Sequence, residues 1–292
     1  MSGDQPRTLI FVGAHPDDET FGLGGTLAQY AMQGVKVVYA CATRGDVGSA
    51  DPEHLEGFSS SGDMRWAELT CAAQELKLAD LIYLGYRDSG MPGSPDNTHP
   101  DALAAAPLEE VTAKVVKVLR EVKPQVVITF DPIGGYRHPD HIAIHNATVR
   151  AFHAAGDPAQ FPECGPAFQP QKLYYSVFPR RWLKMAVRWM PLFGRDPRRF
   201  GRNHDVDLTQ LVEPVFPVHA ATRASRAAAE MRQRAVACHK SQLASGPPAN
   251  GLLGLIMRFL RFNDTYMRAY PPVPANARVS ESDLFEGVEM EG

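Results

Sequence analysis

The sequence predicts an α/β fold: a Rossmann-like, mostly parallel sheet with helices on both faces, followed by a C-terminal extension. Short apolar, β-rich runs recur along the first half of the chain, and segments with apolar residues at helical spacing separate them. Strands joined by helices run parallel in one sheet. We expect a single domain over residues 1–292, with a core at 8–178, a variable insert at 180–205, and a C-terminal helix and irregular tail at 206–292.

The first elements follow one another closely. An apolar run at 8–13 ends in a Pro/Asp turn and predicts the first strand. We expect a helix over 22–33, closed by Gly34, and then a buried strand over 35–42. A second helix is predicted over 64–78, because its apolar residues fall at core spacing: Trp66, Leu69, Ala73 and Leu76.

The same alternation continues to about residue 178. Further strands are expected at 81–84, 125–130 and 172–177. Further helices are expected at 108–122, where valines share one stripe, at 139–155, where proline occupies the first turn, and at 220–241, which is rich in Ala and Arg. Residues 244–292 show no regular pattern, and we expect them to be irregular.

Composition limits the class of protein. With 292 residues, 44% hydrophobic and 22% charged, the chain is typical of a globular protein with a sizeable core. A net charge of −3 argues against a nucleic-acid partner. No apolar run reaches the ~18 residues of a membrane span. The apolar run at 9–14 is followed at once by the acidic stretch His15-Pro16-Asp17-Asp18-Glu19, so this region is too short and too acidic for a secretory signal. We therefore expect a cytoplasmic protein whose four cysteines, at 41, 71, 164 and 238, are reduced thiols.

The segment from Arg180 to Asp205 differs from the rest of the chain. It has eight basic and two acidic residues, a local charge of +6, so the remainder carries −9. Its first part has apolar residues on one helical face and basic residues on the other, which predicts a basic amphipathic helix. Three roles stay open: a lid over the site, a surface for anionic lipid or a hydrophobic substrate tail, and an ordinary helix packed on the core or on another subunit.

Two polar clusters follow predicted strands. One is His15-Pro16-Asp17-Asp18-Glu19, and the other is the stretch 131–141, which ends in His138-Pro139-Asp140-His141. Because the carboxyl ends of parallel strands share one edge of a sheet, we expect the two clusters to meet. A lone His-Pro-Asp is typical of a capped turn. Two His-Pro-Asp motifs at the same edge of the sheet instead favour a functional site.

Imidazole together with carboxylate suits a catalytic zinc site. His15, Asp18 and His141 are the candidate ligands, although the same two-histidine, one-carboxylate set also suits Fe²⁺. Adjacent Asp17 and Asp18 cannot easily point the same way, so one is expected to bind metal and the other to take a proton from the activated water. With His138 and Asp140 nearby, these residues predict metal-assisted hydrolysis of an amide or ester.

At these residues the chain resembles the PIG-L/LmbE-like family of zinc-dependent N-acetylglucosaminyl deacetylases. The similarity covers roughly 8–178 and rests on residues 14–19, Gly24-Gly25-Thr26 and 134–141, with family-like stretches at 43–46 and 84–91 and a weaker match at 239–242. The stretch around Asp88 is most similar to the deacetylases and amidases of the mycothiol pathway.

The resemblance implies a role for each residue. His15, Asp18 and His141 would bind zinc, Asp17 would be the general base, and His138, held by Asp140, would be the acid or the oxyanion stabiliser. Three further positions, Arg65, Asp88 and Met91, would contact the sugar. The expected reaction removes acetyl from an N-acetylglucosamine-type glycoside. An amidase acting on a glucosaminyl-cysteine conjugate and a non-catalytic sugar- or nucleotide-binding module remain as alternatives.

Overall fold

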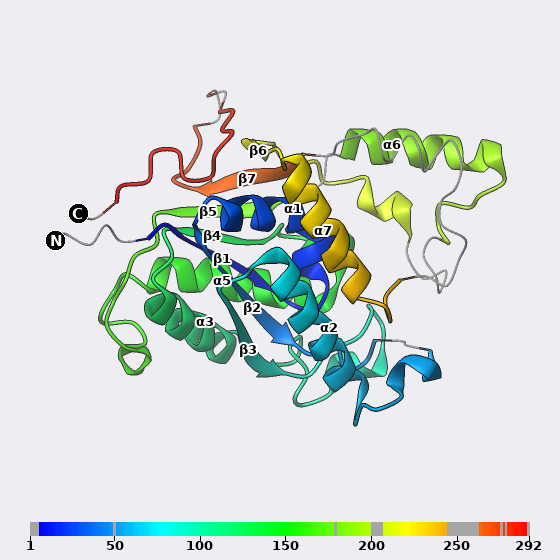
Figure 1. Cartoon of the computed structure of the whole chain (residues 1–292), viewed down its shortest axis with the longest axis horizontal. Coiled ribbons are helices and arrows are strands. Elements are labelled where there is room, and N and C mark those ends of the chain that lie inside the picture. Colours follow the sequence, from blue (N-terminus) through cyan, green and yellow to red (C-terminus); the bar gives the residue numbers. More distant parts are fainter. Residues whose placement is uncertain are drawn as a thin grey trace.

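A seven-stranded sheet lies at the centre of the described part of the chain (Figure 1), in the order β3-β2-β1-β4-β5-β7-β6. It is seen in a computed structural model that describes residues 6–48, 51–177, 180–199, 207–243, 263–274, 277 and 279–290. The strands are β1 (Thr8–Gly13), β2 (Lys36–Thr43), β3 (Asp80–Tyr86), β4 (Val126–Phe130), β5 (Lys172–Ser176), β6 (Ala220–Thr222) and β7 (Asp264–Tyr270).

The first five strands pair in parallel, whereas β7 runs antiparallel to β5 and to β6. The prediction of a mostly parallel sheet is therefore confirmed. Strand β1 lies between β2 and β4, so the order of strands reverses direction at β1. In an open α/β sheet this switch point is where ligands bind, beyond the carboxyl ends of the strands.

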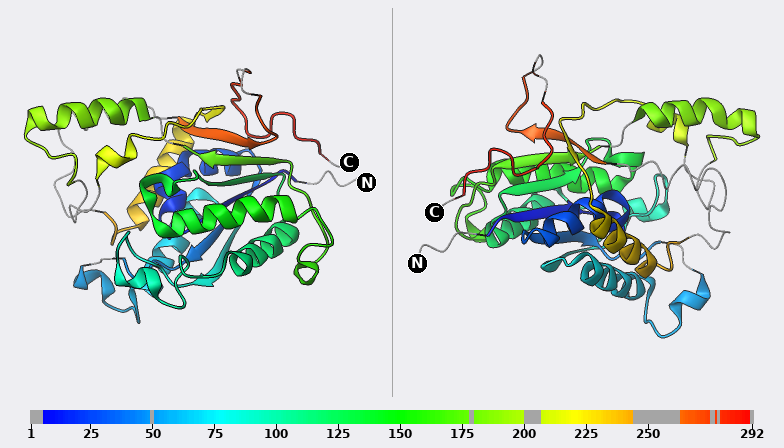
Figure 2. Two further views of the ribbon diagram at one scale, coloured as in Figure 1. Left: turned by 180° about the vertical axis from the view of Figure 1, so that it is seen from behind. Right: turned by 45° about the horizontal axis from the view of Figure 1, so that its top comes forward.

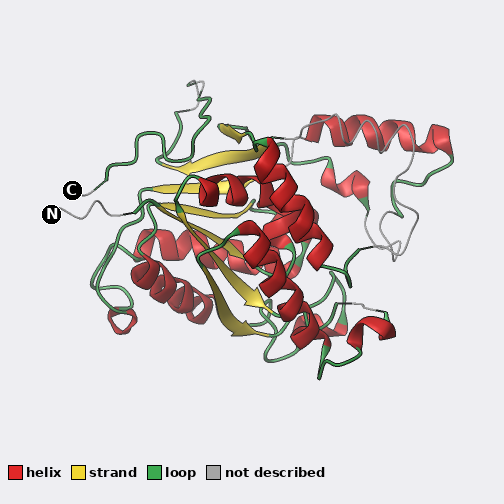
Figure 3. Cartoon of the chain, in the orientation of Figure 1, coloured by secondary structure: helices red, strands yellow, loops and turns green. Residues whose placement is uncertain are grey.

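Helices cover both faces of the sheet (Figure 3). They are α1 (Asp18–Met32), α2 (Ser61–Leu76), α3 (Leu108–Val122), α4 (Gly134–Arg137), α5 (Pro139–Ala154), α6 (Arg180–Trp189) and α7 (Arg226–Cys238). Alternate residues of β1 show the division: Ile10 and Val12 pack with the valines of α3, whereas Leu9 and Phe11 pack with α1 and α2. Helix α7 packs in turn against α1 and α2.

Most boundaries lie within a few residues of the expected ones, but two parts of the C-terminal third were wrong. The expected helix at 220–241 begins only at Arg226, where the Ser225 hydroxyl accepts the Ala228 N–H, and residues 220–222 form β6 instead. Strand β7 was expected to be irregular. Its side chains alternate weakly between apolar and polar, and it becomes a strand because β5 and β6 supply hydrogen-bonding partners on both sides.

The expectation that all four cysteines are reduced is wrong for one pair. Helices α2 and α7 pack side by side, which brings the Cα atoms of Cys71 and Cys238 to 5.8 Å, and their sulfur atoms form a disulfide. These residues are 167 positions apart in sequence, so no local sequence pattern predicts that they are close in space. Cys41 and Cys164 are buried free thiols, as expected.

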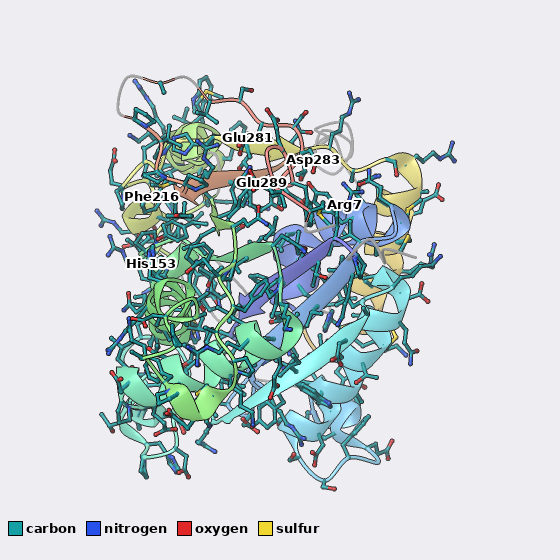
Figure 4. All side chains as sticks on the ribbon, turned by 90° about the vertical axis from the view of Figure 1, so that its left-hand side faces the viewer. Arg7, His153, Phe216, Glu281, Asp283 and Glu289 are labelled. Carbon is teal, nitrogen blue, oxygen red and sulfur yellow. A yellow bond between two sulfur atoms is a disulfide. The ribbon has the colours of Figure 1, made fainter. Side chains whose placement is uncertain are left out.

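The C-terminal segment returns to the sheet beside β6. Glu281 pairs with Ala220, and its carboxylate accepts hydrogen bonds from Lys172 at 2.9 Å, Arg268 at 2.6 Å and the Tyr174 hydroxyl at 2.6 Å. Figure 4 shows Glu281 and Asp283 on this segment near Arg7, and a carboxylate oxygen of Asp283 lies 4.0 Å from an Arg7 nitrogen. Charged contacts thus fix the tail to the sheet.

In the described part of the chain, no helix is both long enough and apolar enough to cross a membrane. Of the basic insert, α6 and the following turn η4 (Met190–Phe193) are described, and they extend from the body of the molecule in both views (Figures 1 and 2). A helix was predicted here and is present. Residues 200–205 of the insert lie outside the described part, as does the apolar, basic stretch at 252–262.

Candidate metal and catalytic site

The two polar clusters meet beyond the carboxyl ends of β1 and β4. The first cluster forms a tight turn between β1 and α1, and the second forms the loop from β4 through α4 to α5. Nitrogen atoms of His15, His138 and His141 lie within 4.8 Å of one another. All three histidines are buried. The prediction that the clusters meet at this edge of the sheet is confirmed, although His15 and His141 are 126 positions apart in sequence.

Asp17 and Asp18 point in different directions. The backbone N–H groups of His15 and Ala14 donate to Oδ2 of Asp18 at 2.7 and 3.1 Å, and Oδ1 lies 3.4 Å from His141 Nε2. Asp17 instead has Oδ2 at 3.1 Å from Arg65, and its φ of 124° is an unfavourable left-handed value for a residue other than glycine. Neighbouring carboxylates thus reach two different partners.

Their surroundings also shift their pKa values apart. Burial is the largest influence on Asp17 and raises its pKa to about 6, although Arg65 opposes this effect. Burial acts in the same direction on Asp18, but the adjacent His141, His15 and backbone N–H groups outweigh it and hold the pKa well below its usual range. Asp18 is thus the carboxylate that stays ionised, and Asp17 is the one that accepts a proton more readily.

His15 is oriented by a carboxylate on its far side. Its Nε2 lies 3.0 Å from Oδ2 of Asp140, which has no exposed surface and also accepts the Ser89 N–H at 3.0 Å and the Ser89 hydroxyl. A proton on Nε2 leaves the lone pair of Nδ1 free to face the site. That Nδ1 lies 3.2 Å from His141 Nε2 and 3.7 Å from Asp18.

The loop after β4 is shaped to present His141. Oδ1 of Asp131 accepts the N–H groups of Ile133 and Gly135, which turns the chain back toward α5. Gly134 has a φ of +63°, and a Cβ atom there would lie 2.8 Å from His141 Cβ, so a larger residue would displace the His141 side chain. The His141 ring stacks on Phe130 with a centroid separation of 3.8 Å.

These donors fit a divalent metal ion. Ligand atoms about 2.0–2.1 Å from a tetrahedral zinc are about 3.3 Å from one another. His15 Nδ1 and His141 Nε2 are 3.2 Å apart, and the two oxygens of Asp18 each approach one of them, Oδ1 at 3.4 Å from His141 and Oδ2 at 3.7 Å from His15. Two imidazole nitrogens facing each other at 3.2 Å need either a proton or a cation between them. Burial lowers the pKa of His15, but the surrounding carboxylates of Asp140, Asp88 and Asp18 outweigh it and raise that pKa. This excess of negative charge favours a cation at the same point.

The expected pairing of His138 with the Asp140 carboxylate is not what the structure has. Nδ1 of His138 accepts the backbone N–H of Asp140 at 3.2 Å and so caps α5, whereas the Asp140 side chain contacts His15 and Ser89. The reason is geometric, since a residue at the N-cap and one in the first turn project differently from the helix. Burial, together with His15 and His141, lowers the pKa of His138 and keeps it neutral.

Arg65 and Asp88 lie at the site, and both side chains contact other groups of the protein, although Arg65 Nε is buried without a hydrogen-bond partner. Arg65 donates to the carbonyls of Pro16 and Gly45 at 2.8 and 3.2 Å, as well as to Asp17, and it is buried. Asp88 Oδ1 lies 3.5 Å from His15 Nε2 and accepts the Gly90 N–H. Met91 follows in the same loop, half-buried, and its carbonyl accepts a hydrogen bond from Asn97.

Three residues acquire a place at the site only through the fold. Ser89 donates its backbone N–H to the Asp140 carboxylate. His239, at the end of α7, has its Nε2 at 2.8 Å from Oε1 of Glu19. The other oxygen of Glu19 accepts the Asp17 N–H at 2.9 Å. Tyr136 has its ring centroid 5.6 Å from that of His138 and 5.1 Å from that of His141. Burial and the charges of Asp18 and Asp17 raise its pKa, so the phenol keeps its proton. The short motifs around these residues point to them, but their contacts could not be predicted.

Comparison with known proteins places this site in a family. Residues 10–152 match the family described as "PIG-L: GlcNAc-PI de-N-acetylase". Over 291 residues the chain is 36% identical to the 1D-myo-inositol 2-acetamido-2-deoxy-alpha-D-glucopyranoside deacetylase of Geodermatophilus obscurus, covering 97% of this chain and 98% of that protein. The protein of the same name from Thermomonospora curvata is 36% identical over 299 residues, with 98% of each chain covered.

Solved structures share the fold at lower identity. The N,N'-diacetylchitobiose deacetylase from Pyrococcus horikoshii is 20% identical with a TM-score of 0.56, over 90% of this chain and 84% of that one. A conserved protein from Thermus thermophilus is 23% identical with a TM-score of 0.56, over 91% of this chain and 96% of that one. The resemblance predicted from the two His-Pro-Asp motifs is confirmed, and the chain belongs to the PIG-L family of deacetylases.

Proposed function

We propose that this protein is a zinc-dependent N-deacetylase that removes the acetyl group from an N-acetylglucosamine-containing glycoside of the glucosaminyl-inositol type. The observation that carries the proposal is the convergence of His15 Nδ1, His141 Nε2 and Asp18 within 3.2–3.7 Å at the switch point of the sheet. Relatives matched over nearly their whole length are named deacetylases of such an inositol glycoside, which supports the substrate class.

A divalent ion held by His15, Asp18 and His141 would polarise the amide carbonyl and make a water molecule more acidic. Asp17 would take a proton from the attacking water, because its raised pKa makes it the better base of the two neighbouring carboxylates. Arg65 would hold the Asp17 side chain in place through the contact at 3.1 Å. Asp140 and Ser89 would keep His15 in one orientation.

His138 would act as a neutral hydrogen-bond donor. Because its Nδ1 accepts the Asp140 N–H, the proton of the neutral ring lies on Nε2. That N–H would stabilise the negative charge that develops on the carbonyl oxygen. The proton that Asp17 takes from the water would pass to the amine nitrogen as the C–N bond breaks. Asp88 and Met91 would contact the sugar. Asp88 would have to bind a sugar hydroxyl while its Oδ1 still lies beside His15 Nε2.

The rival function is an amidase on a glucosaminyl-cysteine conjugate, which would use the same residues with a larger acyl group. A cytoplasmic location, a homo-oligomeric state and Fe²⁺ in place of zinc also stay predictions from the sequence.

Metal content and acetate release together test the proposal. Asp17→Asn should keep one equivalent of metal and lose about 10²–10⁴-fold in kcat, whereas His141→Ala should lose the metal itself. His153→Ala, an exposed histidine on the same helix, serves as the control and should change neither quantity. Wild-type activity in both site variants would contradict the assignment. A chelator-sensitive enzyme that cleaves only the cysteine conjugate would favour the amidase.

A further inference from the structure

We propose that α6 and η4 form a docking surface for an anionic phospholipid bilayer. This surface, called the basic arm below, comprises the described side chains of residues 184–199. The proposal is independent of the chemistry at the metal site, because a bilayer can be bound without any turnover.

The first observation is that the most exposed of the large apolar side chains lie in one part of the chain. Among large hydrophobic residues in the described part of the chain, those at least half exposed lie in the insert or just after it: Met185 (50%), Trp189 (56%), Leu192 (75%), Phe193 (76%) and Val215 (55%). Met185 and Trp189 are four residues apart on α6. Leu192, in η4, is three residues further along the chain. These three side chains, called the apolar row below, are each at least half exposed.

The second observation is the charge beside that row. Lys184 and Arg188 flank it on α6, and Arg195 and Arg198 follow η4, all of them exposed. The basic arm carries a net charge of +4, and the whole insert 180–205 carries +6 on a chain whose remainder carries −9. An apolar row with a tryptophan, bordered by arginine and lysine, is the composition of helices that lie in the plane of a membrane interface. The helix is too short to cross a bilayer, so it would lie on one.

Charge also disfavours the other occupants. Two copies of this chain meeting through their basic arms would place two positive segments against each other, which costs energy in a symmetric contact. A protein partner would have to bring acidic groups opposite the basic side chains, because burying an unpaired charge in an interface is costly. An anionic bilayer satisfies both kinds of side chain, because headgroups attract the arginines while the acyl region accepts the apolar row.

The position of the basic arm connects it to the site. The short helix η5 (Leu208–Leu211) contacts both α6 and α4, and α4 carries Tyr136. A bilayer bound to the arm would therefore lie on the side of the molecule where the β4 loop opens. Lys184 forms an ion pair with Glu213 and so joins α6 to the segment between η5 and β6.

Sedimentation of the full-length protein with vesicles tests the proposal. The wild-type protein should bind vesicles of phosphatidylcholine and phosphatidylglycerol at about 7:3 but not vesicles of phosphatidylcholine alone, and binding should weaken as NaCl is raised. Arg188→Gln with Arg195→Gln should reduce the partition coefficient about 30-fold, since each basic residue near the surface contributes a factor of about five. Trp189→Ser with Phe193→Ser should reduce it about tenfold or more.

A matched control removes one exposed apolar and one exposed basic residue elsewhere, Leu108→Ser with Lys117→Gln on α3, and should bind like the wild type. Circular dichroism of each variant checks that the fold is retained. The proposal is overturned if the wild type ignores anionic vesicles, or if the control loses as much binding as the arm variants. It is also overturned if light scattering shows a dimer that Trp189→Ser with Phe193→Ser dissociates. Acetate release from a soluble substrate should be unchanged in the arm variants, so failure here would leave the proposed deacetylase intact.

Discussion

Glu19→Gln should weaken the fold and slow the reaction through one buried connection. Glu19 and His239 have no exposed surface, and Glu19 Oε1 lies 2.8 Å from His239 Nε2. Burial lowers the pKa of His239, but the Glu19 carboxylate raises it above its usual value, which favours the charged form of this pair. Oε2 of Glu19 accepts the N–H of Asp17 at 2.9 Å. One carboxylate thus joins the end of α7 to the proposed general base.

The size of the effect follows from this burial. Removing one partner of a buried ion pair costs about 3–5 kcal/mol, and for a domain of this size each kcal/mol lowers the melting temperature by about 2 °C. We therefore expect the melting temperature to fall by about 6–10 °C. Asp17 is held at a φ of 124°, a conformation that costs about 1–3 kcal/mol. Loss of its restraint should displace the carboxylate and lower kcat about 10- to 100-fold.

Calorimetry, acetate release and metal analysis measure the three parts of this prediction. Glu75→Gln is the matched control, because Glu75 pairs with Arg234 and also joins α2 to α7, but on the surface. An exposed pair contributes at most about 1 kcal/mol, so the control should melt within about 2 °C of the wild type. Metal content should be unchanged in both variants. Equal melting temperatures for the two variants, or an undiminished kcat in Glu19→Gln, would refute the reasoning.

Three further predictions concern the site and the fold. Tyr136→Phe should lower kcat about 10²-fold without loss of metal if its protonated hydroxyl donates to the reacting amide; an unchanged kcat would exclude that role. Glu281→Gln should lower stability by about 3 kcal/mol at pH 7. Burial raises the pKa of Glu281, but Tyr174, Lys172 and Arg268 lower it overall, so its contribution is present above its unfolded pKa and is lost as pH falls through the folded value. Melting curves of the variant and wild type should converge in acid. Cys71→Ser should cost about 2–4 kcal/mol in urea unfolding, and dithiothreitol should reproduce that loss in the wild type; an insensitive wild type would argue against the disulfide.

The parts of the fold that local patterns encode were predictable. Apolar strands that alternate with helices bearing one apolar stripe favour a parallel sheet covered on both faces, and β1 to β5 form one. Helix α3 has the predicted bounds, Leu108–Val122, because its valines repeat at helical spacing. Strands β6 and β7 were missed because short, weakly alternating segments become strands only when a neighbour offers hydrogen bonds.

The sequence alone determined which residue types gather at the edge of the sheet, since His15, Asp18, His138 and His141 each follow a strand whose direction is set by the helices that connect it to its neighbours. Only the tertiary structure decided how they pair. Asp140 orients His15 rather than His138, Glu19 reaches His239 220 residues away, and Cys71 meets Cys238. Periodicity reports which side of an element is buried, whereas a contact between two side chains depends on the packing and register of elements that are distant in the chain.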